Sequence, residues 1–124
     1  MKKIKISAGD ISLLAELNES VTAQKIWDAL PIEGRANIWG DEIYFEIPVV
    51  TGQEPDARAD VEVGTLGYWE PGHAFCIFFG STPASTDDKP RAASPVNILG
   101  RILDDATQLR SVKSGERVQI TRSE

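Results

Sequence analysis

Residues 66–83 read LGYWEPGHAFCIFFGSTP and contain five of the nine aromatic residues in this 124-residue chain. Within them, residues 75–79 (FCIFF) form a continuous apolar run of strand length, which is typical of a strand covered on both faces. Residues 70–72 (EPG) have turn composition, because proline presets one turn angle and glycine tolerates positive φ. The stretch therefore predicts a central hairpin in a β-rich core.

Strand patterns dominate on both sides of this hairpin. Apolar and polar residues alternate with a period of two, and glycine-containing turns such as residues 8–10 (AGD) and 40–41 (GD) separate them. The predicted strands are residues 3–7, 11–17, 36–39, 42–47, 61–66, 75–79, 96–102 and 118–120. The chain is therefore predicted to be mainly β.

Two short helices interrupt the predicted strands. The first covers residues 23–30, where apolar residues recur at helical spacing. Ser20 or Thr22 can cap its first amides, and Pro31 ends it. The second helix covers residues 104–112, with an aspartate available as its cap.

Two polar segments are predicted to be loops. Residues 51–58 are polar and include a glycine and a proline. Residues 81–95 include three prolines and form the longest predicted connection. A loop of this length in a compact domain is expected to be functional or mobile.

Composition limits the class of protein. The chain is 41% hydrophobic and 26% charged, as in an ordinary globular domain, and its length predicts one domain over residues 1–124. A net charge of −6 argues against a nucleic-acid partner or an anionic membrane, whose phosphates would be repelled. Its one histidine and one cysteine cannot build an internal disulfide or the usual Cys/His zinc site. We expect no metal and no other cofactor.

Location follows from what the sequence does not contain. The opening MKKIKISAGD has no apolar run long enough for a signal peptide. No stretch approaches the roughly 20 apolar residues of a membrane span. We therefore expect a cytoplasmic protein.

The order of elements predicts a closed barrel capped by the two helices, since closure leaves no strand edge exposed. It also resembles the cyclophilins. Residues 22–30 (TAQKIWDAL) resemble their first helix, residues 75–79 their FFIC strand, and residues 96–102 (VNILGRI) their VVFGKV segment. The short prokaryotic branch of cyclophilin-like proteins of unknown function matches more closely, at residues 39–45 (WGDEIYF), 71–80 (PGHAFCIFFG) and 95–102.

This resemblance implies a closed eight-stranded β-barrel with a helix at each end. It also implies peptidyl-prolyl cis-trans isomerase activity. In that reaction an arginine donates a hydrogen bond to the prolyl nitrogen and lowers a rotation barrier of about 20 kcal/mol. In cyclophilins that arginine belongs to an FHR motif before IP. The corresponding residues here, 44–48 (YFEIP), contain none. Arg101, on a predicted strand, is the remaining candidate for the catalytic donor, and pairing with an acidic surface neighbour is its alternative.

Three hypotheses for function follow. The first is a binding module that accepts a peptide, such as a proline-containing segment, or a small apolar ligand in an aromatic-lined groove without efficient catalysis. The second is a weak isomerase, and the third is a scaffold or oligomerisation domain. The ligand-binding residues predicted for the first hypothesis are Tyr44, Tyr68, Trp69, His73, Phe79 and Asn97.

Some of these residues also have a simpler interpretation. His73 follows Pro-Gly and has no obvious partner in sequence, which favours an exposed turn residue. Cys76 lies within an apolar run, where a buried and unreactive thiol is expected. At least one of Tyr68 and Trp69 is expected to pack in the core.

Overall fold

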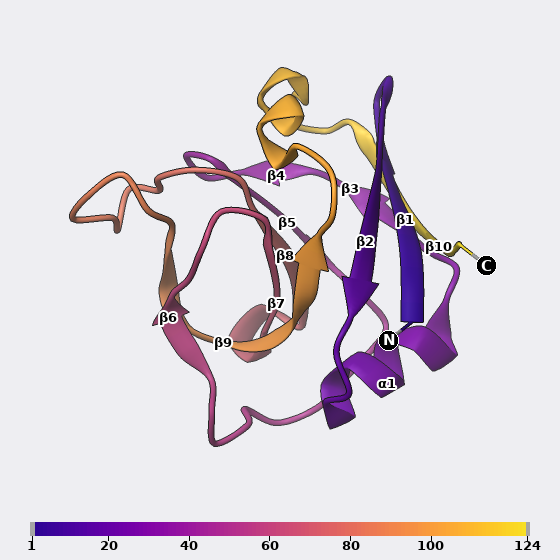
Figure 1. The fold of residues 1–124 in the computed structure, drawn as a ribbon. Coiled ribbons are helices and arrows are strands. Elements are labelled where there is room, and N and C mark those ends of the chain that lie inside the picture. Colours follow the sequence, from indigo (N-terminus) through magenta and orange to yellow (C-terminus); the bar gives the residue numbers. More distant parts are fainter. Residues whose placement is uncertain (1, 124) are drawn as a thin grey trace.

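The computed structural model describes residues 2–123, which form ten β-strands, one α-helix and two 3-10 helices (Figure 1). The strands are β1 (Lys2–Ala8), β2 (Ile11–Leu17), β3 (Ile32–Arg35), β4 (Asn37–Ile38), β5 (Glu42–Glu46), β6 (Arg58–Asp60), β7 (Thr65–Trp69), β8 (Ala74–Phe78), β9 (Arg91–Ile102) and β10 (Arg117–Arg122). The helices are α1 (Val21–Ala29), η1 (Glu70–Gly72) and η2 (Ala106–Ser111). The prediction of a mainly β protein with two short helices, apart from the single turn η1, is confirmed.

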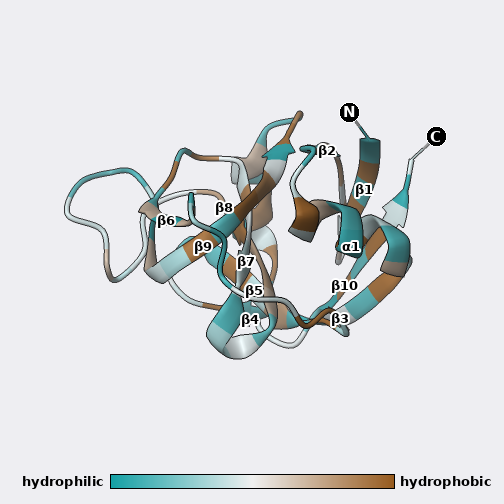
Figure 2. Cartoon of the chain, turned by 90° about the horizontal axis from the view of Figure 1, so that it is seen from below, coloured by the Kyte–Doolittle hydropathy of each residue, from teal (hydrophilic) through white to brown (hydrophobic). Residues whose placement is uncertain are grey.

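The elements at the amino-terminal end follow the sequence pattern closely. β1 and β2 form the predicted antiparallel hairpin, and Gly9 adopts φ 57° at its turn. Ser20 caps α1 by accepting a hydrogen bond from the Ala23 amide at 3.2 Å. The helix buries Ala23 and Ile26 against the sheet, as its apolar stripe predicts. Colours alternate between hydrophobic and hydrophilic along the strands and around α1 (Figure 2).

The strands form one sheet in the order β3-β10-β1-β2-β9-β7-β8-β5-β4, and β6 pairs with β9 beside this path. The prediction of a closed eight-stranded barrel is wrong on both counts. Among the described residues no strand pairing joins the two end strands, β3 and β4, so the sheet is open. The chain crosses the opening at Ala36, which lies between the end of β3 and the start of β4. The Ala36 amide donates a hydrogen bond to the Glu116 carbonyl oxygen at 2.8 Å.

The middle of the chain departs most from the predicted elements. Residues 91–95, predicted as part of a loop, belong to the 12-residue strand β9. Of the predicted strand 61–66, residues 61–64 instead form a turn that separates β6 from β7, and residues 65–66 begin β7. Prolines on both sides of residues 91–94 conceal the strand pattern in the sequence. The segment is a strand because of tertiary pairing, since β9 pairs with β2, β6 and β7 along different parts of its length.

The two larger helical segments lie at opposite ends of the curved sheet (Figure 1). The second predicted helix exists as the 3-10 helix η2, and its cap is Asp105, which accepts a hydrogen bond from the Thr107 amide at 3.0 Å. In the described part of the chain, no helix combines the length and the apolar character that a membrane span requires. The cytoplasmic location stays a prediction.

Candidate functional site

The curved sheet buries apolar side chains on both of its faces. The larger cluster, on the inner face, includes Ile43, Phe45 and Phe75, whereas the smaller one, on the outer face, includes Cys76 and Phe78. All five residues of β8 are buried for this reason. The alternation along β5 then places Glu42 and Tyr44 on the outer face.

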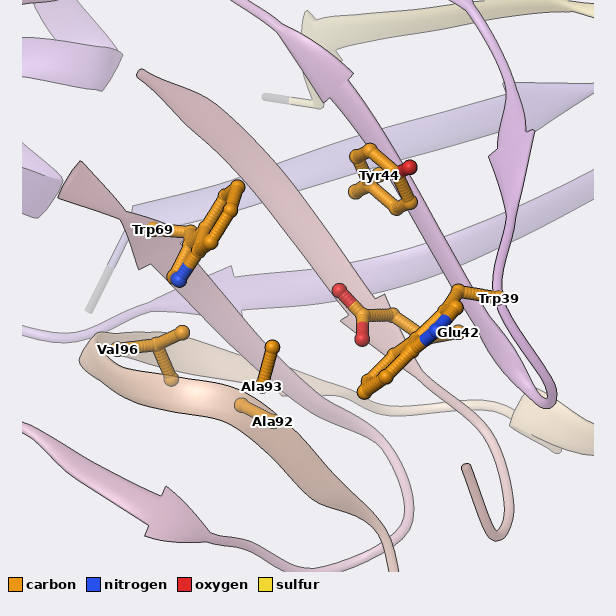
Figure 3. Close-up of a pocket in the computed structure, with 7 residues that line it drawn as sticks. All are labelled: Trp39, Glu42, Tyr44, Trp69, Ala92, Ala93 and Val96. Atoms are coloured by element: carbon orange, nitrogen blue, oxygen red, sulfur yellow. The ribbon is translucent and has the colours of Figure 1, made fainter. Parts of the chain in front are cut away.

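A cavity of about 210 Å³ opens over this outer face. Its lining residues come from the turn before β5, from β5 itself, from β7 and from the first half of β9 (Figure 3). They are Trp39, Glu42, Tyr44, Trp69, Ala92, Ala93 and Val96. Three aromatic side chains therefore stand around a single carboxyl group, on a wall of small aliphatic residues.

Hydrogen bonds hold the ring of Trp69 and the backbone of Trp39 and Tyr44. The Trp69 indole Nε1–H donates to the Ser94 hydroxyl oxygen at 2.7 Å, which fixes the ring against β9. Trp39 is positioned through its backbone, since its amide donates to the Glu42 carbonyl oxygen at 3.0 Å and the Glu42 amide donates back at 3.2 Å. The Asn37 side-chain amide donates to the Tyr44 carbonyl oxygen at 3.2 Å. A ring held by its own hydrogen bond, as that of Trp69 is, loses little conformational freedom when a ligand binds.

Glu42 supplies the one carboxyl group among the lining residues, and only 5% of this residue is exposed. Its burial raises the pKa of the carboxyl group to about 7, an effect that a hydrogen bond with the Cys76 thiol partly offsets. Burial and the neighbouring Glu42 raise the pKa of the Cys76 thiol well above its ordinary value. Cys76 is therefore buried, as the sequence predicts, and its lack of reactivity stays a prediction.

Two of the predicted ligand-binding residues, Tyr44 and Trp69, line the cavity together. Phe79 and Tyr68 lie instead in the larger cluster, where Phe79 is 2% exposed and the Tyr68 hydroxyl donates to the Val49 carbonyl oxygen at 2.7 Å. His73 is partly exposed in a left-handed conformation at the end of η1. The structure thus places these three outside the lining of the cavity, and their roles in binding stay predictions.

The Asn97 side chain is buried and forms three hydrogen bonds within the protein. Its side-chain amide donates to the Thr22 hydroxyl and to the Gly52 carbonyl oxygen, both at 3.0 Å, and its carbonyl oxygen accepts from the Glu54 amide at 2.7 Å. Thr22, the alternative helix cap in the sequence, also donates to the Glu54 carboxylate. In this structure Asn97 ties β9 to α1 and to the segment before β6.

Arg101 lies outside the cavity lining as well. Its side chain is 70% exposed and its Nε lies 3.3 Å from the Glu16 carboxylate, on the neighbouring strand β2. Arg101 thus pairs with an acidic neighbour on the surface, which was the alternative to a catalytic role in the sequence analysis. Its catalytic role stays a prediction.

Sequence reasoning missed five lining residues: Trp39, Glu42, Ala92, Ala93 and Val96. For Glu42 a signal was present, because it lies two residues before Tyr44 in an alternating strand and so shares its face. For the two alanines no signal existed once residues 81–95 had been predicted as a loop.

Comparisons with known proteins agree on the fold. A family model described as Cyclophilin-like matches residues 2–121. The solution structure of the hypothetical protein AF2241 from Archaeoglobus fulgidus is 42% identical to this chain, with a TM-score of 0.82, and the match covers 98% of this chain and 95% of that one. A structure of McbB in complex with tryptophan is 18% identical with a TM-score of 0.69, covering 97% of this chain and 44% of that one. No match was found among curated proteins.

Proposed function

We propose that this protein, which belongs to the cyclophilin-like family, is a binding module that accepts a small apolar ligand, or one apolar side chain of a peptide, in the aromatic cavity. The observation that carries the proposal is the arrangement of Trp39, Tyr44 and Trp69 around one open space. Aromatic rings offer a large apolar contact area and prefer to stack against other flat groups. The ligand is therefore expected to present a ring.

The size of the cavity limits what it can hold. At about 210 Å³ it is smaller than the roughly 300–1,000 Å³ of sites for drug-sized ligands. A single ring with a short substituent suits this volume. McbB, which shares the fold, is described in complex with tryptophan, and this supports an aromatic ligand here.

The three tryptophans of the chain provide the test. Trp39 and Trp69 line the cavity, whereas Trp27 lies on α1 with the Arg122 guanidinium 4.5 Å from its ring centre. In an ¹⁵N NMR titration with 2-phenylethanol, a neutral aromatic probe, we expect the indole N–H signals of Trp39 and Trp69 to shift. The Trp27 signal is expected to stay in place and so serves as an internal control.

A pair of variants sharpens this titration. Trp39→Leu removes one aromatic wall and is expected to weaken binding about fivefold, the typical value of one aromatic contact. Val63→Ala, which removes exposed apolar atoms outside the cavity, should leave the affinity unchanged. Equal shifts at all three tryptophans, or no shifts at millimolar probe, would contradict the proposal.

Weak peptidyl-prolyl isomerisation, with Arg101 as the donor, is the alternative that the resemblance to cyclophilins implies. A protease-free assay on Xaa-Pro peptides separates it from simple binding. As a binding module, the protein should leave the uncatalysed rate unchanged. A faster rate that Arg101→Ala abolishes would favour the isomerase, and a faster rate that survives this substitution would require another donor.

A further inference from the structure

The Glu42 carboxyl group is buried without a cationic partner. In the described part of the chain, no lysine, arginine or histidine forms an ion pair with it. Arg91, which precedes the cavity-lining Ala92 on β9, pairs with Asp60, and Arg110 pairs with Asp41. A buried carboxylate normally has a partner, because removing its charge from water is costly.

This carboxyl group also has an unusual setting. It points into the space between the indole of Trp39 and that of Trp69, with the Tyr44 ring beside it (Figure 3). Aromatic faces are electron-rich and attract cations, and surrounding rings are a recurrent way to bind ammonium groups. The carboxyl group and the three rings therefore both favour a positively charged ligand.

From this juxtaposition we infer that the ligand carries a protonated amine, which binds against the Glu42 carboxylate and is surrounded by the rings of Trp39, Tyr44 and Trp69. This inference deepens the proposed function and rests on it. The ligand class it specifies is a small amine that carries an aromatic ring, with its apolar part against Ala92, Ala93 and Val96.

The net charge of the whole chain also favours a cationic ligand. A net charge of −6 attracts cations and repels anions. Glu42 and Tyr44 are the titratable residues among those that line the cavity, and Cys76 contacts Glu42 from β8. The β7 and β9 walls contribute Trp69, Ala92, Ala93 and Val96, none of which is charged. An anionic ligand would meet no positive group in this lining.

Ionisation of the Glu42 carboxyl group should make the binding of an amine depend on pH. Because burial holds the pKa of Glu42 near 7, the carboxyl group is largely protonated at pH 5.5 and largely ionised at pH 8. An amine that remains protonated over this range should bind more tightly at pH 8 and should displace a proton when it binds at pH 6. The affinity of a neutral ligand should change little.

The test compares three probes that share one phenyl ring: 2-phenylethylamine, 2-phenylethanol and 3-phenylpropanoate. At pH 8 we expect the cationic amine to bind about tenfold more tightly than the neutral alcohol, the factor expected for one hydrogen bond to a charged group. The anionic probe should bind most weakly. At pH 5.5 the advantage of the amine should shrink by roughly tenfold, following the protonation of Glu42.

Two glutamate variants on the same strand identify the group responsible. Glu42→Gln should bring the amine and the alcohol to within about twofold of each other, whereas Glu46→Gln, an exposed residue outside the cavity lining, should preserve the preference. The indole N–H signals of Trp39 and Trp69 report whether the cavity is intact in each variant.

The outcomes separate this inference from the proposed function. Equal binding of amine and alcohol, or an amine preference that persists in Glu42→Gln, overturns the inference and leaves the binding module standing. If no probe shifts the cavity tryptophans, both fail. A preference that Glu42→Gln and low pH each remove confirms the ammonium site.

Discussion

The carboxyl group of Glu42 occupies a position that disfavours its charge. In the unfolded chain its pKa lies near 4.5, whereas burial raises it to about 7 in the folded protein. Below pH 4.5 both states hold the proton, so folding is unaffected. Between pH 4.5 and 7 the unfolded chain releases the proton while the folded protein keeps it, and stability therefore falls as pH rises.

This fall in stability with rising pH predicts how Glu42→Gln changes the free energy of unfolding. The variant cannot ionise, so relative to the wild type it should gain stability from pH 4.5 to pH 8. The shift from 4.5 to about 7 sets an upper limit of about 3 kcal/mol for this relative gain. Urea unfolding of both proteins at the two pH values measures it.

Glu46→Gln is the matched control, because it removes the same charge from an exposed position on the same strand. It separates the effect of burial from the effect of lowering the net charge. The interpretation is wrong if the two variants follow the same pH profile relative to the wild type.

At the scale of elements, β9 organises the protein. It pairs with β2, β6 and β7, and its first half forms one wall of the cavity. Asn97 in its middle bonds to Thr22 on α1 and to the segment around Gly52 and Glu54. A single buried side chain therefore connects three parts of the chain that are distant in sequence.

Asn97→Ala should be strongly destabilising. It removes three hydrogen bonds and leaves the Glu54 amide and the Gly52 carbonyl oxygen without their partner, which we expect to lower the free energy of unfolding by about 3 kcal/mol. Asn37→Ala removes one bond from an exposed asparagine and should cost about 1 kcal/mol or less. Chemical denaturation compares the two, and equal losses would contradict the connecting role of Asn97.

At the scale of the whole molecule, the sheet curves almost into a barrel without closing. Its outermost strands are β3 and β4, which follow each other in the chain and are separated by Ala36. β4 has only two residues, both exposed. Short and exposed edge strands limit unwanted pairing with other chains.

Hydrogen exchange distinguishes this open sheet from a closed barrel. Strands β1, β2, β7 and β8 each have a neighbour on both sides, so their amides should exchange slowest. Amides of β3 and β4, paired on one side only, should exchange faster. Protection of β3 and β4 equal to that of β1, measured by NMR in deuterated buffer, would indicate that closure occurs in solution.

The sequence alone determined those features that depend on local order. Alternation predicted the β1–β2 hairpin, a helical stripe with a serine cap predicted α1, and the apolar run at residues 75–79 predicted the strand buried on both faces. Family motifs distributed along the chain predicted the cyclophilin-like fold, and the comparisons confirm it. These signals are readable because each lies within one element.

The tertiary structure alone decided the open edge, the length of β9 and the composition of the cavity. Pairing with three separate strands extends β9 through a segment that its prolines mark as a loop. The cavity joins Trp39 and Glu42, from one hairpin, with Trp69 and Ala92 from two other segments of the chain. The burial that shifts the pKa of Glu42 exists only once these segments meet, because desolvation depends on every neighbour around a group and no single stretch of sequence contains them.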